Sequence, residues 1–113
     1  DTAREYINRW HYFVKSKREM CALFGIGHAA HRFIQITETA EYFAALLDNN
    51  RSKTGLFPAG LKIPIRTPAE IDLRKILVII LGVHDRDTYK VTQTLRSKGY
   101  DGQILSIYDY PPE

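Results

Sequence analysis

The chain has few cysteines, no long apolar run and no continuous stripe of basic residues, the features typical of disulfide-rich, membrane and nucleic-acid-binding proteins. It contains one cysteine, Cys21, so it can form neither an intramolecular disulfide nor a cysteine-based zinc cluster. Its longest apolar run, from Ile76 to Leu81, has six residues, whereas a membrane-spanning helix needs about 20. The net charge is only +3 and the basic residues are scattered, so we predict no nucleic-acid partner. No signal peptide is visible, and we predict a cytoplasmic protein.

The composition is that of one folded domain. The chain has 113 residues, of which 44% are hydrophobic and 26% are charged. A disordered tail would lack the apolar residues from which a core is built. The chain begins at Asp1 without a methionine, so we expect it to be a piece of a longer protein.

The apolar pattern predicts strands and helices that alternate along the chain. Runs that are apolar at every position are typical of strands covered on both faces. The expected strands and extended pieces are residues 21–24, 42–47, 61–65, 76–81 and 103–108. The expected helices are residues 1–17, residues 31–39, a short helix after Thr67 and residues 85–98. Phe33, Ile34 and Ile36 should face the sheet, and Pro64 places its extended piece at an edge or outside the sheet.

Local signals mark the ends of two helices. Thr67 and Glu70 can form a capping box around Pro68, which fits the first turn of a helix. Asp85 is expected to cap the last helix, and Gly99 lies where a C-terminal glycine is typical.

Alternating strands and helices indicate an α/β fold with a parallel sheet and helices on both faces. We predict a small Rossmann-like domain of three layers with strand order 3-2-1-4-5. The run from Ile76 to Leu81 should lie near the centre of the sheet because it is the most apolar. Residues 1–20 would form an extra N-terminal helix and a linker, and residues 21–110 the Rossmann-like domain.

The first predicted helix carries a wide apolar stripe. Its members recur at spacings of three and four, and they are Tyr6, Ile7, Trp10, Phe13 and Val14. The stripe either folds back onto the sheet or covers another part of a larger protein. In the second case Trp10 would be partly exposed here and could drive homo-oligomer formation.

A glycine-containing turn follows the first predicted strand. Gly25-x-Gly27-x-x-Ala30 lies between a strand and a helix, where free N–H groups favour a phosphate. Asp48 ends the next strand, at the place where an acid commonly binds a ribose hydroxyl. We assign Gly25, Gly27, Asp48 and the adjacent Asn49 to a nucleotide-type ligand site. The alternative is that the glycines only make the turn and Asp48 only caps a loop.

Histidines lie near the same predicted cleft. His28 is expected at its mouth, and His84 follows the central strand. If the strand order is right, residues 25–28 and 82–85 face each other beyond the carboxyl ends of the strands, where ligands bind in open parallel sheets. His28 and His31 would need His84 as a third ligand to hold a metal, and we predict no metal site.

Several catalytic signatures are missing. The sequence has no Gly-x-Ser-x-Gly elbow, no phosphate-binding P-loop and no His-Glu-x-x-His motif. It also lacks the Tyr-x-x-x-Lys pair of short-chain dehydrogenases. We therefore assign no catalytic residue.

The middle of the chain resembles a known family. The resemblance covers about residues 22–108, and it rests on the Gly25-Ile-Gly-His turn, Asp48, Asn49, Lys53, Gly55, Pro58, Gly60 and Ile63-Pro64-Ile65. This pattern resembles the C-terminal Rossmann-like domain of bacterial sugar C-methyltransferases. It is also similar to nucleotide-sugar-binding domains of bacterial polysaccharide biosynthesis proteins. The resemblance implies a domain that helps to hold an activated sugar, while the methyl donor binds a separate preceding domain.

Three functional hypotheses remain open from the sequence. The first is a module of a carbohydrate-modifying protein that binds a nucleotide or a nucleotide sugar. The second is the NAD-binding half of an oxidoreductase or epimerase, which the missing proton-transfer pair argues against. The third is a structural domain with a vestigial cleft.

Overall fold

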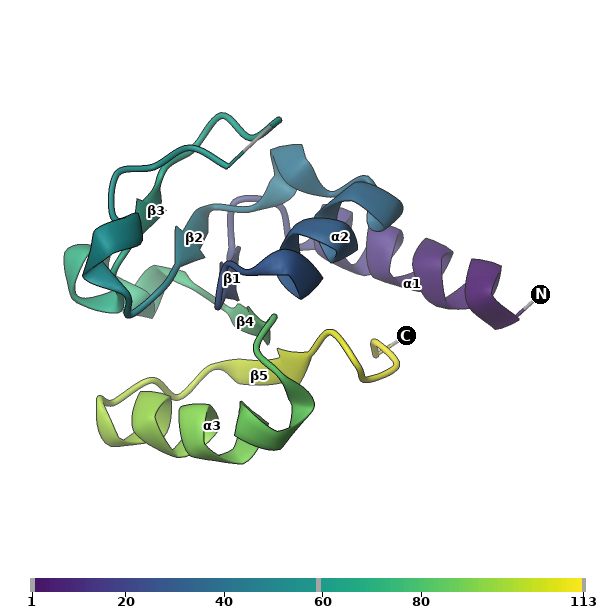
Figure 1. Ribbon diagram of the computed structural model, residues 1–113. Coiled ribbons are helices and arrows are strands. Elements are labelled where there is room, and N and C mark those ends of the chain that lie inside the picture. The colour runs from purple at the N-terminus through teal and green to yellow at the C-terminus, as the bar shows by residue number, and fades with distance from the viewer. Residues whose placement is uncertain (1, 59, 113) are drawn as a thin grey trace.

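Five parallel strands form the sheet at the centre of the structure. A computed structural model describes residues 2–58 and 60–112. The strands are β1 (Cys21–Phe24), β2 (Ala45–Leu47), β3 (Ile65–Arg66), β4 (Val78–Leu81) and β5 (Gln103–Ser106). They lie in the order β3-β2-β1-β4-β5, and each neighbouring pair is parallel (Figure 1). The predicted α/β fold and its strand order are therefore confirmed.

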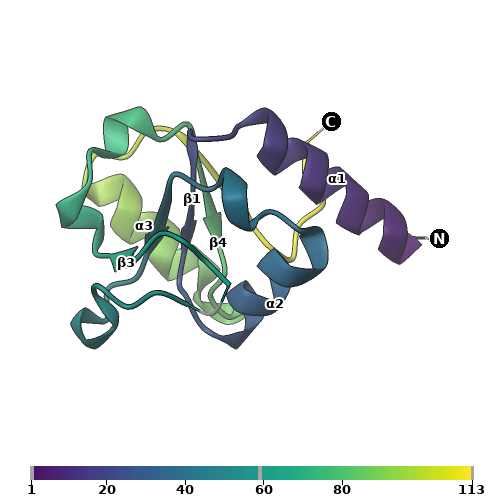
Figure 2. The ribbon, with the colours of Figure 1, turned by 90° about the horizontal axis from the view of Figure 1, so that it is seen from above.

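Helices cover both faces of this sheet, and they are α1 (Thr2–Ser16), α2 (His28–Thr37) and α3 (Thr88–Ser97). α1 and α2 lie together on one face, and α3 lies on the other (Figures 1 and 2). Leu23 and Ile80 join the core beneath α1 and α2, whereas Phe24 and Leu81 join the core against α3. Because successive strand residues point to opposite faces, burial on both sides explains strands that are apolar throughout.

The prediction placed the second strand too early. Residues 40–42 form a 3-10 turn, and β2 begins only at Ala45. Tyr42 and Phe43 are buried, but they pack into the core beneath α1 and α2 and not in a strand. The error arose because an apolar run does not distinguish a strand from a buried turn.

β1 has its predicted bounds, whereas β3, β4 and β5 differ from theirs. β3 starts at Ile65, directly after Pro64, and it lies at the edge of the sheet as the proline indicated. β4 begins at Val78, and the side chain of Leu77 just before it is half-exposed. β5 ends at Ser106, so it is shorter than the predicted segment 103–108.

The inner face of α2 is a stripe that includes a polar residue. Ala30, Phe33, Ile34 and Thr37 are buried at helical spacing, which confirms the prediction for Phe33 and Ile34. Ile36 lies off this stripe and is 43% exposed, so its predicted contact with the sheet is wrong. The Thr37 hydroxyl donates a hydrogen bond to the backbone oxygen of Phe33 (2.6 Å). Because this polar group has a partner, the Thr37 side chain can be buried.

Three predicted caps can be compared directly with the structure. Thr67 and Glu70 form the expected capping box, with the Thr67 N–H donating to Glu70 Oε1 (2.8 Å), although it opens only a 3-10 turn. Asp85 does not cap the last helix, because a 3-10 turn at residues 85–87 precedes α3. His84 caps that turn by accepting a hydrogen bond from the N–H of Arg86 (3.2 Å). Gly99, at a φ of +92°, follows the end of α3 as predicted.

α1 is part of the same core. Trp10 is fully buried, and its ring packs edge-on against Phe33 of α2 at 5.2 Å. Its indole N–H donates to the backbone oxygen of Asp109 (3.1 Å), and the Tyr6 hydroxyl donates to that of Ile107. The expectation of a partly exposed Trp10 is therefore wrong, and the alternative of a stripe folded back onto the domain is confirmed. Across residues 2–58 and 60–112, no helix is long and apolar enough to cross a membrane.

Candidate functional site

The turn after β1 needs its first glycine for structural reasons. Gly25 has a φ of +88°, a conformation that residues with side chains rarely adopt. A Cβ on Gly25 would also lie 2.5 Å from Cγ1 of Val83, which follows β4. A Cβ on Gly82 would lie 2.6 Å from the Cβ of Ala30 in α2. The β1 turn and the β4 turn are thus in contact, as the predicted strand order required.

Replacing Gly25 should therefore damage the fold. We expect Gly25→Ala to lower the free energy of unfolding by roughly 2–4 kcal/mol, because it adds both a strained φ and a steric overlap. Urea unfolding followed by circular dichroism measures this loss. The matched variant Gly27→Ala should lose less than about 1 kcal/mol, because Gly27 has neither constraint. Equal losses of unfolding free energy in the two variants would contradict the conclusion that the fold needs a glycine at position 25 but not at position 27.

Gly27 has a different character. It is the N-cap residue of α2, with an extended backbone (φ −118°), and it is exposed. A Cβ placed on it would have no neighbour within 4 Å. Neither the conformation nor the packing of the domain requires a glycine here. The missing side chain leaves the backbone at the start of α2 open to approach from outside.

The first turn of α2 presents backbone N–H groups at this open position that the helix itself does not bond. The N–H of His31 donates to the backbone oxygen of Gly27 (3.0 Å) as the helix begins. The N–H groups of His28, Ala29 and Ala30 precede it and have no acceptor within the helix. The N-cap residue, Gly27, has no side chain with which to cap this end of α2. Together with the helix dipole, these groups favour a negative charge.

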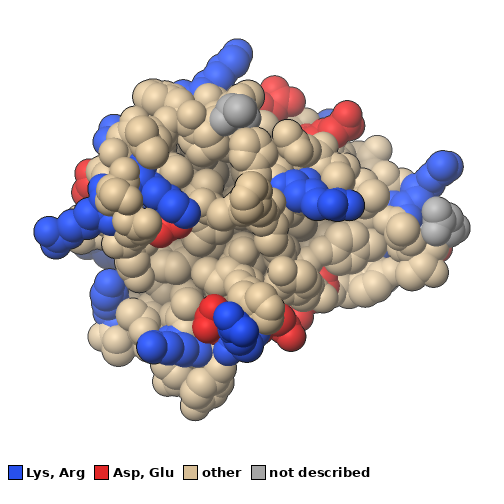
Figure 3. Space-filling model, viewed as in Figure 1, with Lys and Arg blue, Asp and Glu red and all other residues tan. Residues whose placement is uncertain are grey.

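A groove of about 420 Å³ runs between this turn and the connection from β2 to β3. Its lining residues are Ile26, Gly27, His28, His31, Lys53, Leu56, Phe57, Pro58 and Ile65. Leu56 and Phe57 are 56% and 61% exposed, which is unusual for large apolar side chains. Figure 3 shows a face whose middle is largely free of charged side chains, with both basic and acidic side chains around it. The groove thus combines an apolar wall with backbone donors.

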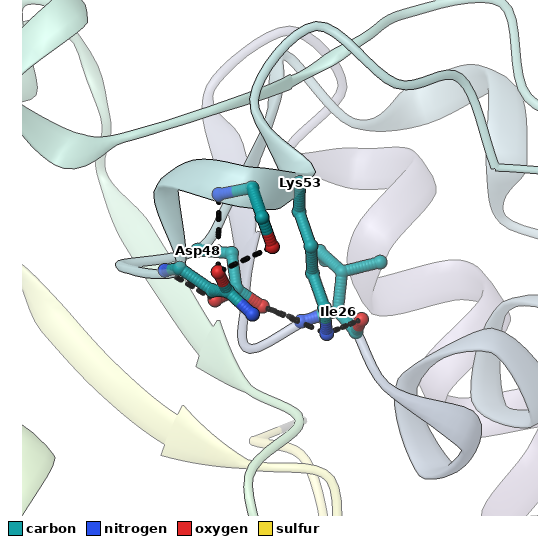
Figure 4. Close-up of polar contacts among 5 residues, drawn as sticks. Ile26, Asp48 and Lys53 are labelled. Atoms are coloured by element: carbon teal, nitrogen blue, oxygen red, sulfur yellow. Dashed lines mark hydrogen bonds and ion pairs between the residues drawn. The ribbon is translucent and has the colours of Figure 1, made fainter.

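Asp48 and Lys53 join the two walls of the groove at Ile26. Asp48 Oδ2 accepts a hydrogen bond from the Ile26 N–H (2.9 Å), and Lys53 Nζ donates to the Ile26 oxygen (2.8 Å; Figure 4). Lys53 Nζ also lies 3.6 Å from Asp48 Oδ2. The other carboxylate oxygen, Oδ1, accepts from the N–H of Asn50 (2.9 Å). Both oxygens of Asp48 are therefore bonded within the protein.

The structure separates the predicted site residues into two groups. Gly25, Gly27, His28 and Asp48 lie together around the turn. Asn49 instead lines a smaller hollow of about 130 Å³ against α3, beside Lys90 and Lys98. His84 is exposed, does not line the groove, and uses Nδ1 to cap the turn after β4.

Sequence reasoning missed the apolar wall of the groove. In the sequence, Lys53 enters only the family resemblance, and no residue after Asp48 is predicted to form an apolar wall. The signal that could have revealed the wall is the pair Leu56-Phe57, which is apolar without belonging to any strand or helix.

Neither a metal centre nor a reactive thiol stands out in the described part of the chain. No group of three or more His, Cys, Asp or Glu side chains in residues 2–58 and 60–112 could hold a metal ion. Burial raises the pKa of the Cys21 thiol to about 12, so this side chain stays protonated at neutral pH.

Comparison with known protein families, with curated proteins and with solved structures found no match to the chain.

Proposed function

We propose that this chain is a binding domain for a nucleotide-type ligand, either a nucleotide or a nucleotide sugar, whose phosphate binds at residues 25–29. The observation that carries the proposal is Gly27. It is a glycine that the fold does not need, at the helix end that has free N–H groups. A ligand that approaches the backbone closely would need the space that a side chain would fill.

The groove suits the rest of such a ligand. Its volume of about 420 Å³ falls within the usual range for small-molecule sites. Leu56, Phe57 and Pro58 give one wall an apolar surface on which a base or a sugar ring can pack. Phe57 is an exposed aromatic ring, and base–aromatic stacking is favourable with every base.

The larger setting is also part of the proposal. We place the domain in a bacterial carbohydrate-modifying protein, as the resemblance to sugar C-methyltransferases implies. The chain would hold the activated sugar while another part of that protein supplies the chemistry. A NAD-binding role has less support, because the Asp48 carboxylate that would bind a ribose already accepts two backbone N–H groups.

Calorimetric titration tests the proposal directly. Inorganic pyrophosphate, UDP, a dTDP-sugar, NAD and S-adenosylmethionine would each be titrated into the full chain. We expect UDP or the dTDP-sugar to bind more tightly than pyrophosphate, because the groove adds contacts beyond the phosphate. No binding of any of these ligands would support the alternative of a structural domain with a vestigial cleft.

Gly27→Val is the sharpest variant for this test. A branched side chain at Gly27 would cover the N–H groups of the first turn of α2, so we expect no measurable binding of UDP or pyrophosphate. The fold should survive, because a Cβ at this position has no neighbour within 4 Å and the backbone is extended. Gln35→Val, an exposed position further along α2, is the control and should bind normally. Unchanged affinity in Gly27→Val would refute the proposed phosphate position.

A further inference from the structure

Ile26 is the one residue between the two glycines of the turn, and side chains hold both of its backbone polar groups. It follows β1 and precedes α2, so it belongs to neither a strand ladder nor a helix. Its N–H donates to Asp48, and its oxygen accepts from Lys53. These two contacts fix the peptide planes on either side of Ile26. They therefore also fix the direction in which the N–H groups after Gly27 point.

The two side chains are themselves held in place. The side chain of Asp48 is only 14% exposed, and its Oδ1 accepts the Asn50 N–H. Asn50 in turn caps the 3-10 turn that carries Lys53, by accepting the Ser52 N–H (3.1 Å). The connection after β2 is thus bonded to itself as well as to Ile26. This arrangement resists rotation of the Asp48 carboxylate toward a ligand.

We propose that Asp48 is a positioning residue, which shapes the phosphate-binding turn through Ile26 and does not touch the ligand. Lys53 supports the same turn from the other side of Ile26, by donating to its backbone oxygen. The inference rests on the proposed function, and it replaces the ribose contact that the sequence suggested for Asp48. In this arrangement both oxygens of the Asp48 carboxylate accept hydrogen bonds from backbone N–H groups. The ligand contacts the turn, whose shape these hydrogen bonds hold, and does not contact Asp48.

The direction in which pyrophosphate affinity changes when Asp48 is replaced separates a positioning role from a direct ribose contact. A carboxylate beside an anion site repels the anion, so removing the Asp48 charge should by itself strengthen pyrophosphate binding. A direct ribose contact would leave pyrophosphate binding unchanged or stronger, while weakening UDP. A positioning role predicts weaker binding of both ligands by a similar factor, because the turn loses its shape.

The first experiment compares Asp48→Ala and Asp48→Asn with the unaltered chain by calorimetry, using pyrophosphate and UDP as probes. We expect Asp48→Ala to weaken both ligands about tenfold, the usual effect of losing a charge-assisted hydrogen bond. Asp48→Asn removes the same charge but keeps one acceptor oxygen, so it should lie between Asp48→Ala and the unaltered chain. Asp101→Ala, which removes an exposed carboxylate before β5, should change neither affinity.

The second experiment needs no ligand. Amide hydrogen exchange should become at least about tenfold faster at Ile26 and Gly27 in Asp48→Ala, while Leu23 and Ile80 keep their protection. Lys53→Met should produce a smaller change confined to the same turn, and Lys62→Met, which removes an exposed cation from the same connection, should produce none. A purely structural role for Asp48 would instead reduce protection throughout the sheet.

The outcomes are distinct. Weakened UDP with unchanged or stronger pyrophosphate binding would overturn the positioning role in favour of a ribose contact. Unchanged exchange at Ile26 would also overturn it. If the unaltered chain binds neither probe, the proposed function fails, and the exchange pattern alone then decides whether Asp48 shapes the turn.

Discussion

Val78→Asp is expected to unfold the chain. Val78 is 2% exposed in β4, between β1 and β5, and it faces the core beneath α1 and α2. A carboxylate there would be buried without a cation or a donor, at a cost of roughly 5 kcal/mol or more. The total stability of a small domain is about 5–15 kcal/mol, so the loss removes most or all of it. Far-ultraviolet circular dichroism and urea titration at neutral pH would show the effect.

The control for this prediction is the neighbouring residue. The Leu77 side chain is 50% exposed just before β4, so Leu77→Asp introduces the same charge one position earlier without burying it. We expect that variant to stay within about 1 kcal/mol of the unaltered chain. If the two variants lost similar stability, the burial of Val78 or the exposure of Leu77 would be wrong.

The burial of both faces of β4 also shows why the sheet could be predicted from the sequence. Segments 21–24 and 78–81 are apolar at every position, and only a strand covered on both faces explains this in so short a run. The parallel direction of the strands follows from the alternation of strands and helices, and the order 3-2-1-4-5 was predicted as that of a Rossmann-like domain. Tyr42 and Phe43 could not be assigned correctly, because their burial depends on packing against α1, which lies far away in the sequence.

The candidate site was predicted in part, for a related reason. The position of Gly25 and Gly27 after a strand identified the turn, but their opposite roles depend on Val83, a distant residue that crowds only the first of them. Asp48 was located correctly at the end of β2, yet its partners Ile26 and Lys53 became visible only when the loops were placed. Asn49, one residue further on, lies on the side of α3, because one step along the chain changes the direction of a side chain.

Trp10→Ala should cost about 3–5 kcal/mol of unfolding free energy, the second-largest effect we expect. The indole is fully buried, and it contacts rings on two helices, Phe13 of α1 and Phe33 of α2. Removing it leaves a cavity and takes away the donor for the backbone oxygen of Asp109. Since Trp10 is the one tryptophan of the chain, its fluorescence in the unaltered protein should be blue-shifted and weakly quenched by acrylamide.

Two controls identify which part of the indole matters. Trp10→Phe keeps most of the ring volume and loses only the N–H, so it should cost less than half as much as Trp10→Ala. Tyr12→Ala removes a ring of the same helix that is 65% exposed, and it should be nearly neutral. If Trp10→Ala were as harmless as Tyr12→Ala, or if Trp10 emitted like an exposed indole, α1 would not be packed on the domain. The stripe of α1 would then again be a candidate surface for self-association, which its burial against α2 and residues 107–109 now argues against.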